Sequence, residues 1–419
     1  MKPSTNDKKF LQAINMFMQV VFAFFDIFFS IYIYEMSNNL NFVFCYSIFR
    51  CFFTMVFEFF LIKILNEKNY LIIYRLGFVF ALISIALIFT ISTTRLYMVF
   101  VVQLVYALTI MCYYLPHEVS IMNKNTKNSI SKFVGIQQVL TLIAGVLSPF
   151  LSGVVIDYVS YEVLFIFIMI LSFICFLCSF KINKGVVNES KITVRKFIKE
   201  SHKIKHIKLC YLSHALHKAP GCGVITMILP IMLFMKFNSN FSVGNYSAIA
   251  TTLSGIVLIV ITKFYKPKNI YITISTTVLV LTSSIILIWS SPVLFFVYYF
   301  LSTISTKVIA KYDAELVYVA LSKTPVDEYK KEHHYIFCVY DHTAKIVSYV
   351  FALIIYNLCK TVLSLSIIIF SLTILQIFAS WLMIKSEKSH NEYIKELETQ
   401  SSTNENISTE NLEISNSQV

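Results

Sequence analysis

Long apolar stretches follow one another along most of the chain, each separated from the next by a short polar segment. A helix needs about 20 mostly apolar residues to cross the hydrocarbon core of a bilayer. The pattern therefore predicts an all-α integral membrane protein with twelve transmembrane helices, over residues 10–34, 41–62, 71–92, 96–117, 134–156, 161–180, 209–235, 242–262, 270–289, 293–320, 333–357 and 362–384. The first stretch carries Asn15, Gln19 and Asp26 and no small-residue cleavage site follows it, so we expect it to remain as a span.

Composition supports a membrane protein. Of the 419 residues, 57% are hydrophobic and only 14% are charged, whereas soluble domains have about 25% charged residues. The net charge of +12 suggests a nucleic-acid partner at first sight, but most of the 35 Lys and Arg residues fall in alternate connections. The other connections hold only Arg95, Lys236 and Lys360. Basic loops stay in the cytoplasm, so both termini are expected to be cytoplasmic and no nucleic acid is needed to explain the charge.

The longest connection divides the predicted spans into two groups of six. We expect an N-terminal six-helix bundle (1–180), a basic cytoplasmic linker (181–208), a C-terminal six-helix bundle (209–385) and a disordered, polar cytoplasmic tail (386–419). The linker is interpreted either as a basic helix lying on anionic lipid headgroups or as a solvated connection.

The two groups carry traces of repetition, as in transporters built from two repeats. Lys9-Phe10-Leu11 with Asn15 and Gln19 aligns with Lys208-Leu209-Cys210 followed by His214 and Lys218. Likewise, Glu118 near the end of the fourth span falls opposite Glu315 in the tenth. Both matches place polar residues at equivalent positions of the two groups.

One stretch carries a family resemblance. Gly135-Ile136-Gln137-Gln138 through Gly145, Pro149, Gly153 and Asp157 to Tyr161-Glu162-Val163-Leu164-Phe165 resembles the fifth span of the major facilitator superfamily of secondary transporters and its exit into the sixth. The resemblance implies a fold of two six-helix bundles, a central route lined by spans 1, 4, 7 and 10, and transport driven by an ion gradient.

The sequence departs from that family at three motifs. The segment 62–70 lacks the glycines and the aspartate of the family's loop between spans 2 and 3. Phe100–Leu104 keeps Gln103 of the fourth-span motif without its arginine, and the fifth-span signature survives only as Ser148-Pro149 and Ser152-Gly153. These motifs do not establish export by proton exchange.

Charged residues inside the N-terminal spans are candidates for the solute and ion pathway, because each costs about 2.5–3.5 kcal/mol to insert. Asp26 and Arg50 both lie about 13 Å from the outer ends of their spans, so an ion pair between them is expected. We interpret Asp26 as a carboxylate that responds to a proton or cation; the alternative is a fixed structural pair. Glu58 shares a helix face with Arg50 and Thr54.

The C-terminal spans carry a second group of polar candidates. His214, His217 and Lys218 share a face of the seventh span, and Pro220 and Gly221 follow in a segment that is easily bent and suits a gate. His214 and His217 suggest a metal, but no third ligand is evident, so we expect neither a metal nor a cofactor. Asp341 and Lys345 are spaced to pair within one helix, as are Lys311 and Glu315, which leaves Lys307 for Asp341 or for an anionic solute.

Gly145, Pro149 and Gly153 form a stripe of small residues on the fifth span. Such a stripe allows close packing against a span of the other bundle, which would permit rocking. Packing alone explains it equally well.

These observations predict a secondary active transporter, not an enzyme, that moves a small solute by alternating access, with proton or sodium as coupling ion. Efflux of an amphipathic compound is slightly favoured by the aromatic content and by the remnant of the fifth-span signature. Uptake of a nutrient or organic ion, and a non-transporting membrane sensor with the same fold, are the alternatives. No ATP-binding loop is present. We expect a monomer in the bilayer of a bacterial cytoplasmic membrane.

Overall fold

Helices make up almost all of the computed structural model, which describes residues 5–417 except 67, 125–126, 183–193, 265–267, 289–291, 322–323, 327–328 and 360. No strand occurs in this described part. The N-terminal group consists of α1 (Thr5–Ala23), η1 (Phe24–Phe28), α2 (Phe29–Ser37), α3 (Leu40–Ile64), α4 (Tyr70–Ile88), α5 (Met98–Lys124), α6 (Lys127–Tyr158) and α7 (Tyr161–Ser179). The rest consists of α8 (Val194–Ser201), α9 (Lys205–Ala219), η2 (Pro220–Val224), α10 (Ile225–Phe237), α11 (Asn240–Phe264), α12 (Lys268–Ile288), α13 (Pro292–Ala320), α14 (Lys330–Cys359) and α15 (Val362–Ser417).

Eleven helices in the described residues are long and apolar enough to cross a membrane. The apolar helix α10 is shorter, but it continues α9 through η2 without a connecting loop. Residues 205–237 therefore form one helical unit where the seventh span is expected. The chain is a multi-pass membrane protein.

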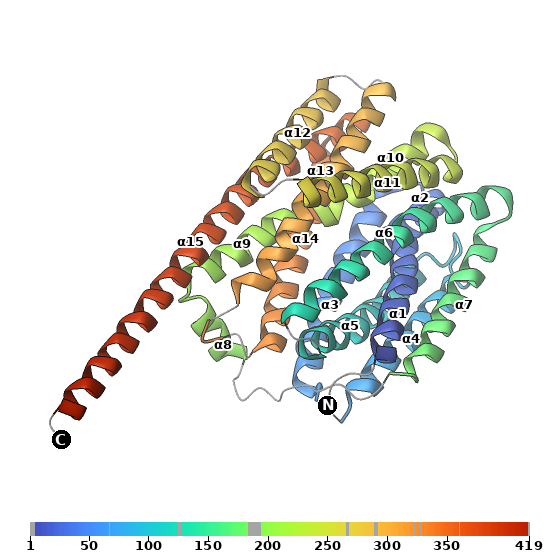
Figure 1. Ribbon diagram of the computed structural model, residues 1–419. Coiled ribbons are helices and arrows are strands. Elements are labelled where there is room, and N and C mark those ends of the chain that lie inside the picture. The colour runs from blue at the N-terminus through green and yellow to red at the C-terminus, as the bar shows by residue number, and fades with distance from the viewer. Residues whose placement is uncertain are drawn as a thin grey trace.

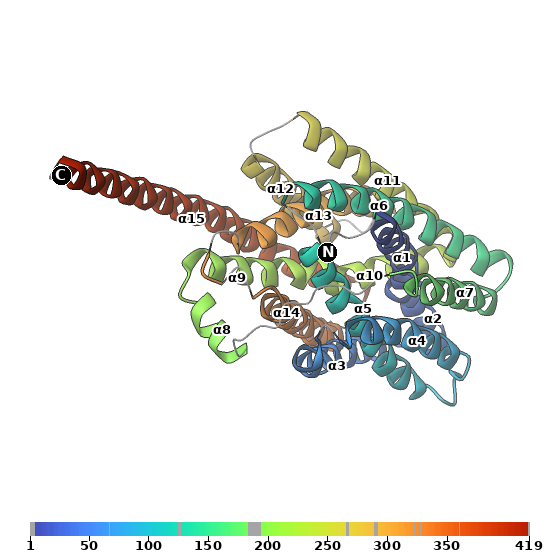
Figure 2. The same cartoon turned by 60° about the horizontal axis from the view of Figure 1, so that its bottom comes forward.

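The helices form two groups that lie side by side, with both termini toward the same end (Figures 1 and 2). Within the first group α5 packs against α3 and α4, and α1 packs against α6 and α7. Within the second, α9 packs against α14 and α15, and α12 against α13 and α15. Contact between the groups is made mainly by two helix pairs, α3 with α14 and α6 with α11.

The first spans of the two groups end in the same way. Asn38 follows α2 in the left-handed conformation (φ 46°, ψ 33°), and Asn238 follows α10 in nearly the same conformation (φ 47°, ψ 41°). These are the two non-glycine residues with positive φ among the described residues, and they lie two hundred positions apart. Each span also contains one π-helical turn, η1 or η2. The matching caps and turns indicate that the two groups are structural repeats.

The stripe of small residues on α6 lies against α11 of the other group. A Cβ atom added to Gly153 would lie 2.5 Å from the Asn240 carbonyl oxygen, and one added to Gly145 would lie 3.3 Å from the Thr251 methyl group. In return, Gly244 of α11 lies directly against the Pro149 carbonyl. The backbones of α6 and α11 are therefore in direct contact here.

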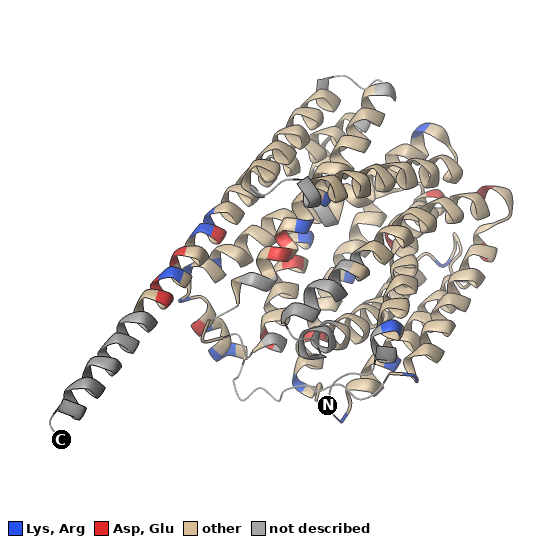
Figure 3. Ribbon diagram, in the orientation of Figure 1, with Lys and Arg blue, Asp and Glu red and all other residues tan. Residues whose placement is uncertain are grey.

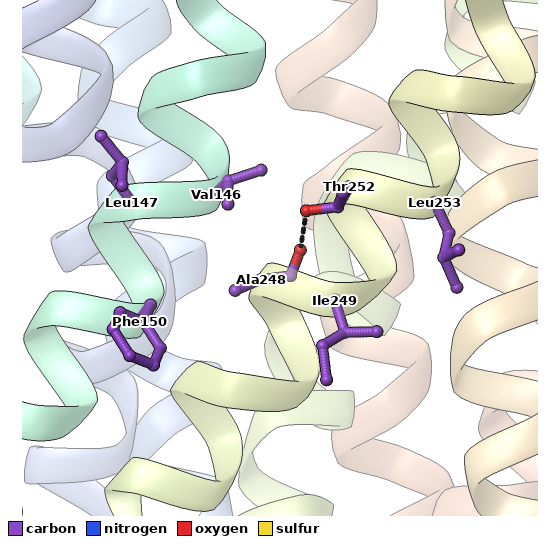
Figure 4. A pocket seen from close by; sticks show the side chains of 7 residues that line it. All are labelled: Val146, Leu147, Phe150, Ala248, Ile249, Thr252 and Leu253. Atoms are coloured by element: carbon purple, nitrogen blue, oxygen red, sulfur yellow. Dashed lines mark hydrogen bonds between the residues drawn. The ribbon is translucent and has the colours of Figure 1, made fainter.

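Beside this contact the surface is hollowed into an apolar groove of about 280 Å³ (Figure 4). Val146, Leu147 and Phe150 form one wall, and the opposite wall comes from α11. The hydroxyl of Thr252 donates to the Ala248 carbonyl at 2.8 Å and so presents no free donor to the groove. Such a surface suits lipid chains.

The C-terminal segment differs from the sequence-based expectation. In place of a disordered tail over 386–419, α15 continues to Ser417 and projects from the bundles, carrying charged residues on its projecting part (Figure 3). The first turns beyond the expected span are held on the body of the protein: Ser386 donates to the His206 carbonyl at 2.7 Å, and the His390 and Tyr393 rings pack on His206. The disordered tail was expected from the polar composition of this segment, which carries no information about its contacts with His206. Of the linker, 183–193 lies outside the described residues, and α8 follows it.

Candidate functional site

The first polar cluster lies where the first span forms a π-helical turn. Asp26 sits in η1, and π-helical turns within helices often occur at functional sites. Its Oδ1 atom lies 3.2 Å from Nη1 of Arg50 on α3, which is the ion pair expected from the depths of the two residues. The Asp26 side chain is 57% exposed and that of Arg50 only 16%. The carboxylate therefore remains accessible while the guanidinium is mostly enclosed.

Aromatic rings enclose the Arg50 guanidinium. It lies 5.8 Å from the centre of the Tyr106 ring, and Tyr106 stacks on Phe25 with ring centres 3.8 Å apart. Beside them the Tyr46 hydroxyl donates to Ser30 at 2.9 Å. A cation over an aromatic face in a low-dielectric environment is stabilised by the ring quadrupole.

The second polar cluster surrounds α9. Nδ1 of His214 lies 2.7 Å from Oδ2 of Asp313 on α13, and the Asp313 side chain is 3% exposed. Three residues further on, Nδ1 of His217 lies 2.9 Å from Oε1 of Gln376 on α15, whose amide donates to Ser380 at 3.2 Å. The two histidines thus point to different helices and do not converge on one point. The described residues contain no group of three or more His, Cys, Asp or Glu side chains that could hold a metal ion.

Asp313 and Gln376 are the functional candidates that sequence analysis missed. On α13 the charged residues Lys307, Lys311 and Glu315 recur every four residues and lie on one face. Asp313 lies on another face, where Ser305 and Ile309 are also buried, and this buried stripe is the signal that identifies it.

Of the two partners that the sequence offers for Asp341, the structure shows Lys345 and not Lys307. Asp341 Oδ2 lies 2.7 Å from Nζ of Lys345 on the same helix, and Lys307 is exposed. The intrahelical partner is already in place one turn away, so a pair between helices is not needed. The other expected intrahelical pair, Lys311 with Glu315, is present at 4.0 Å.

The two clusters are joined through α14. The Asp341 and Lys345 side chains are each 18% exposed, and the Lys345 stem lies against Gly223, where an added Cβ would be 3.2 Å from Cγ. Asp341 is within electrostatic range of Lys218 and His214. Gly223 interrupts the helical conformation in η2 (φ −114°, ψ −107°), in the segment that also contains Pro220 and Gly221 and that the sequence predicted to bend.

On the other side, α14 faces α3. The Cys51 thiol, next to Arg50, is within electrostatic range of Asp26, Arg50, Asp341 and Lys345 together. Ionisable groups from both bundles therefore meet at the α3–α14 contact. We call the Asp26–Arg50, Asp341–Lys345 and His214–Asp313 pairs together with Lys218 the polar belt.

Glu58 lies on the same contact but nearer the end that holds the termini. It is fully buried on α3, with Oε1 3.5 Å from Nε2 of His334 on α14. Gln103 on α5 is also fully buried, and neither of its amide atoms has a hydrogen-bond partner among the described residues. Of the sequence candidates, Gln103 and Lys307 form no hydrogen bond or ion pair with the polar belt in the part of the chain that the structure describes, whereas Glu58 lies within electrostatic range of Asp341. The side chain of Glu118 lies outside the described residues.

Comparison with known proteins gives a fold and no family. No family model matches the sequence, and no curated protein matches it. Among solved structures, a mutant of the nucleoside transporter NupG matches with a TM-score of 0.65 at 11% identity, covering 90% of this chain and 99% of that chain. A bacterial metal transporter matches with a TM-score of 0.59 at 11% identity, covering 91% and 98%.

The chain has the fold of these transporters. The match covers both bundles, so the transporter fold accounts for nearly the whole chain. One neighbour is named for nucleosides and the other for a metal, so the transporter fold alone does not identify a solute.

Proposed function

We propose that this protein is a secondary active transporter of the major facilitator superfamily type, moving a small polar solute by alternating access between its two bundles. The observation that carries this proposal is the polar belt, in which ionisable groups from both bundles meet inside otherwise apolar helices. Groups that are costly in a membrane usually mark a solute or ion pathway.

The topology follows from counting residues 205–237 as the seventh span. This gives twelve spans, with both termini and the basic linker in the cytoplasm. The ends of α2 and α10 then lie on the outer side. There α10 packs against α2 and η1, and Ser47 donates to the Met227 sulfur at 3.4 Å. This arrangement corresponds to a state that is closed at the outer end, where the two bundles contact each other.

The chemistry of the belt favours a polar or charged solute over an amphipathic one. Carboxylate, guanidinium, ammonium and imidazole groups recognise hydrogen-bonding or ionic groups. A polar nutrient or an organic ion is therefore a better supported solute than an amphipathic compound.

Two carboxylates are candidates for coupling. Asp26 is accessible and paired with Arg50, whereas Asp313 is enclosed and paired with His214. A coupling carboxylate must gain and lose a cation or proton during the cycle, and each pair offers a partner that stabilises the ionised form.

Transport by purified protein in liposomes tests the proposal. Uptake and efflux of nucleosides, amino acids, organic anions and organic cations are measured under imposed pH or sodium gradients. We expect at least one polar solute to accumulate under one of the two gradients. We expect Asp26→Asn or Asp313→Asn to abolish this accumulation and to leave movement of the solute down its own concentration gradient unchanged. Glu162→Gln, which removes an exposed carboxylate outside the belt, is the matched control. Absence of movement of every solute under both gradients would favour the sensor alternative.

A further inference from the structure

The end of α6 is bound to the start of α11 by a carboxylate. Asp157 Oδ1 accepts from the Asn240 backbone N–H at 3.0 Å, and Oδ2 accepts from the Phe241 N–H at 2.9 Å and from the Ser239 hydroxyl at 2.7 Å. The first N–H groups of a helix have no partner within the helix, and a negative charge is favourable there. Because α6 and α11 belong to different bundles, this capping interaction holds the bundles together.

An equivalent contact exists between the other two helices. The Asn357 side-chain oxygen, near the end of α14, accepts from Nδ2 of Asn41 at the start of α3, at 2.7 Å. Asn357 lies two hundred positions after Asp157, and Phe241 lies two hundred positions after Asn41. The same offset separates the left-handed Asn38 and Asn238, so the two contacts occupy equivalent places in the two repeats.

The two contacts differ in strength. At the first, a carboxylate accepts three hydrogen bonds, and the Tyr161 hydroxyl adds a link within reach of Glu35 (2.7 Å) and Asn240 (3.1 Å). At the second, two neutral amides share one hydrogen bond in an exposed position. Hydrogen bonds to an ionised group are roughly twice as strong as those between neutral groups.

We infer that these contacts are two symmetry-related clasps that close the outer end of the protein, and that the stronger one sets the balance between outer-closed and outer-open states. The Asp157 clasp comprises Asp157, Ser239, Asn240 and Phe241; the Asn357 clasp comprises Asn41 and Asn357. The inference rests on the proposed function, because it assumes that the bundles rock apart at this end.

A reporter at Ser47 measures opening directly. Ser47 is 1% exposed and contacts Met227 across the bundles, so a cysteine placed there is reached from outside only when the outer end opens. Labelling of Ser47→Cys by a membrane-impermeant maleimide is followed in sealed cells or right-side-out vesicles. It is quantified by mass spectrometry with fragmentation of the labelled peptide, which assigns the label to one position and so distinguishes the reporter from Cys45 and Cys51.

Asp157→Asn keeps the shape of the side chain and removes its charge. We expect labelling at position 47 to become about tenfold faster, the effect of losing about one charge-assisted hydrogen bond. Glu162→Gln, a loss of charge at the same end but outside the clasp, should leave the rate unchanged. Thermal unfolding of each purified variant verifies that the protein is folded.

Asn357→Asp tests the inference in the opposite direction. A carboxylate in the weaker clasp should strengthen its bond to Asn41 and slow labelling, and in Asp157→Asn it should restore much of the closed state. Equal labelling rates in folded wild type, Asp157→Asn and Asn357→Asp would overturn the inference, as would faster labelling in Asn357→Asp. If the rates respond as expected but no solute is moved, the clasps stand and the transporter proposal fails. If solute moves and the rates do not respond, the clasps fail alone.

Discussion

The partners of the Asp26–Arg50 pair are unevenly exposed, and this predicts unequal effects of removing each. Asp26→Asn leaves a guanidinium that is 16% exposed without its counter-ion, whereas Arg50→Gln leaves a carboxylate that is 57% exposed. Stranding a buried charge costs about 3–5 kcal/mol, and stranding an exposed one about 1 kcal/mol or less. Because this pair is partly exposed, we expect Asp26→Asn to destabilise the protein by about 2–3 kcal/mol and Arg50→Gln by about 1 kcal/mol.

Thermal unfolding of the purified variants in one detergent, followed by helical circular dichroism, measures the difference. The double variant Asp26→Asn/Arg50→Gln should be more stable than Asp26→Asn alone, because no charge is then stranded. If Arg50→Gln were the more damaging single change, the contact of Arg50 with Tyr106 would matter more than the ion pair.

At the residue scale, the sequence predicts how deep in the membrane a polar side chain lies, but not toward which neighbouring helix it points. Asp26 and Arg50 lie on consecutive antiparallel spans, so counting residues from the shared turn places them side by side. His214 and Asp313 are on spans far apart in the chain, and only the packing of α9 against α13 brings them to 2.7 Å. Depth alone did not distinguish the face of α13 that carries Asp313 from the face that carries Lys307.

At the element scale, the contact of α6 with α11 predicts a steep dependence on position along one stripe. A Cβ at Gly153 would lie 2.5 Å from a backbone oxygen, which cannot move without shifting the helix. A Cβ at Gly145 would lie 3.3 Å from a side-chain methyl group, which can give way. We expect Gly153→Ala to destabilise by about 1–3 kcal/mol and Gly145→Ala to stay within about 1 kcal/mol of wild type, since alanine favours a helix over glycine.

The pair of variants is its own control, because both make the same chemical change on the same face of one helix. Thermal unfolding gives the stabilities. A Gly145→Ala variant as unstable as Gly153→Ala would mean that the whole stripe, and not its end near Asn240, limits how closely the bundles approach.

The elements show how far periodicity predicts a membrane protein. The spans were predictable because each is a long apolar stretch, and α9 to α10 was found although Pro220 and two glycines interrupt it. The π-helical turns were not predictable. A π-helical turn adds one residue to a helix, and this hardly changes the length of the apolar stretch or the depth of its residues in the membrane. The helical extension of α15 was missed because contacts with His206, and not composition, anchor its beginning.

At the scale of the whole molecule, the orientation of the protein in the membrane determines which side of the membrane the two clasps face. Both termini lie toward the same end of the bundles (Figure 1), and the basic connections predicted to be cytoplasmic follow the same alternation along the chain. By the positive-inside rule, we expect the turns at Asn38 and Asn238 to face the outside.

Fusions test this orientation directly. Green fluorescent protein attached after Val419 should fluoresce, because it folds in the cytoplasm, and alkaline phosphatase inserted after Ser92 should be active, because that connection is expected outside. Phosphatase inserted after Lys266, in a connection expected inside, is the matched control and should be inactive. The reversed result would place the Asp157 clasp in the cytoplasm and the Glu58–His334 contact outside. The clasp would still join α6 to α11, but it would then close the cytoplasmic end of the protein.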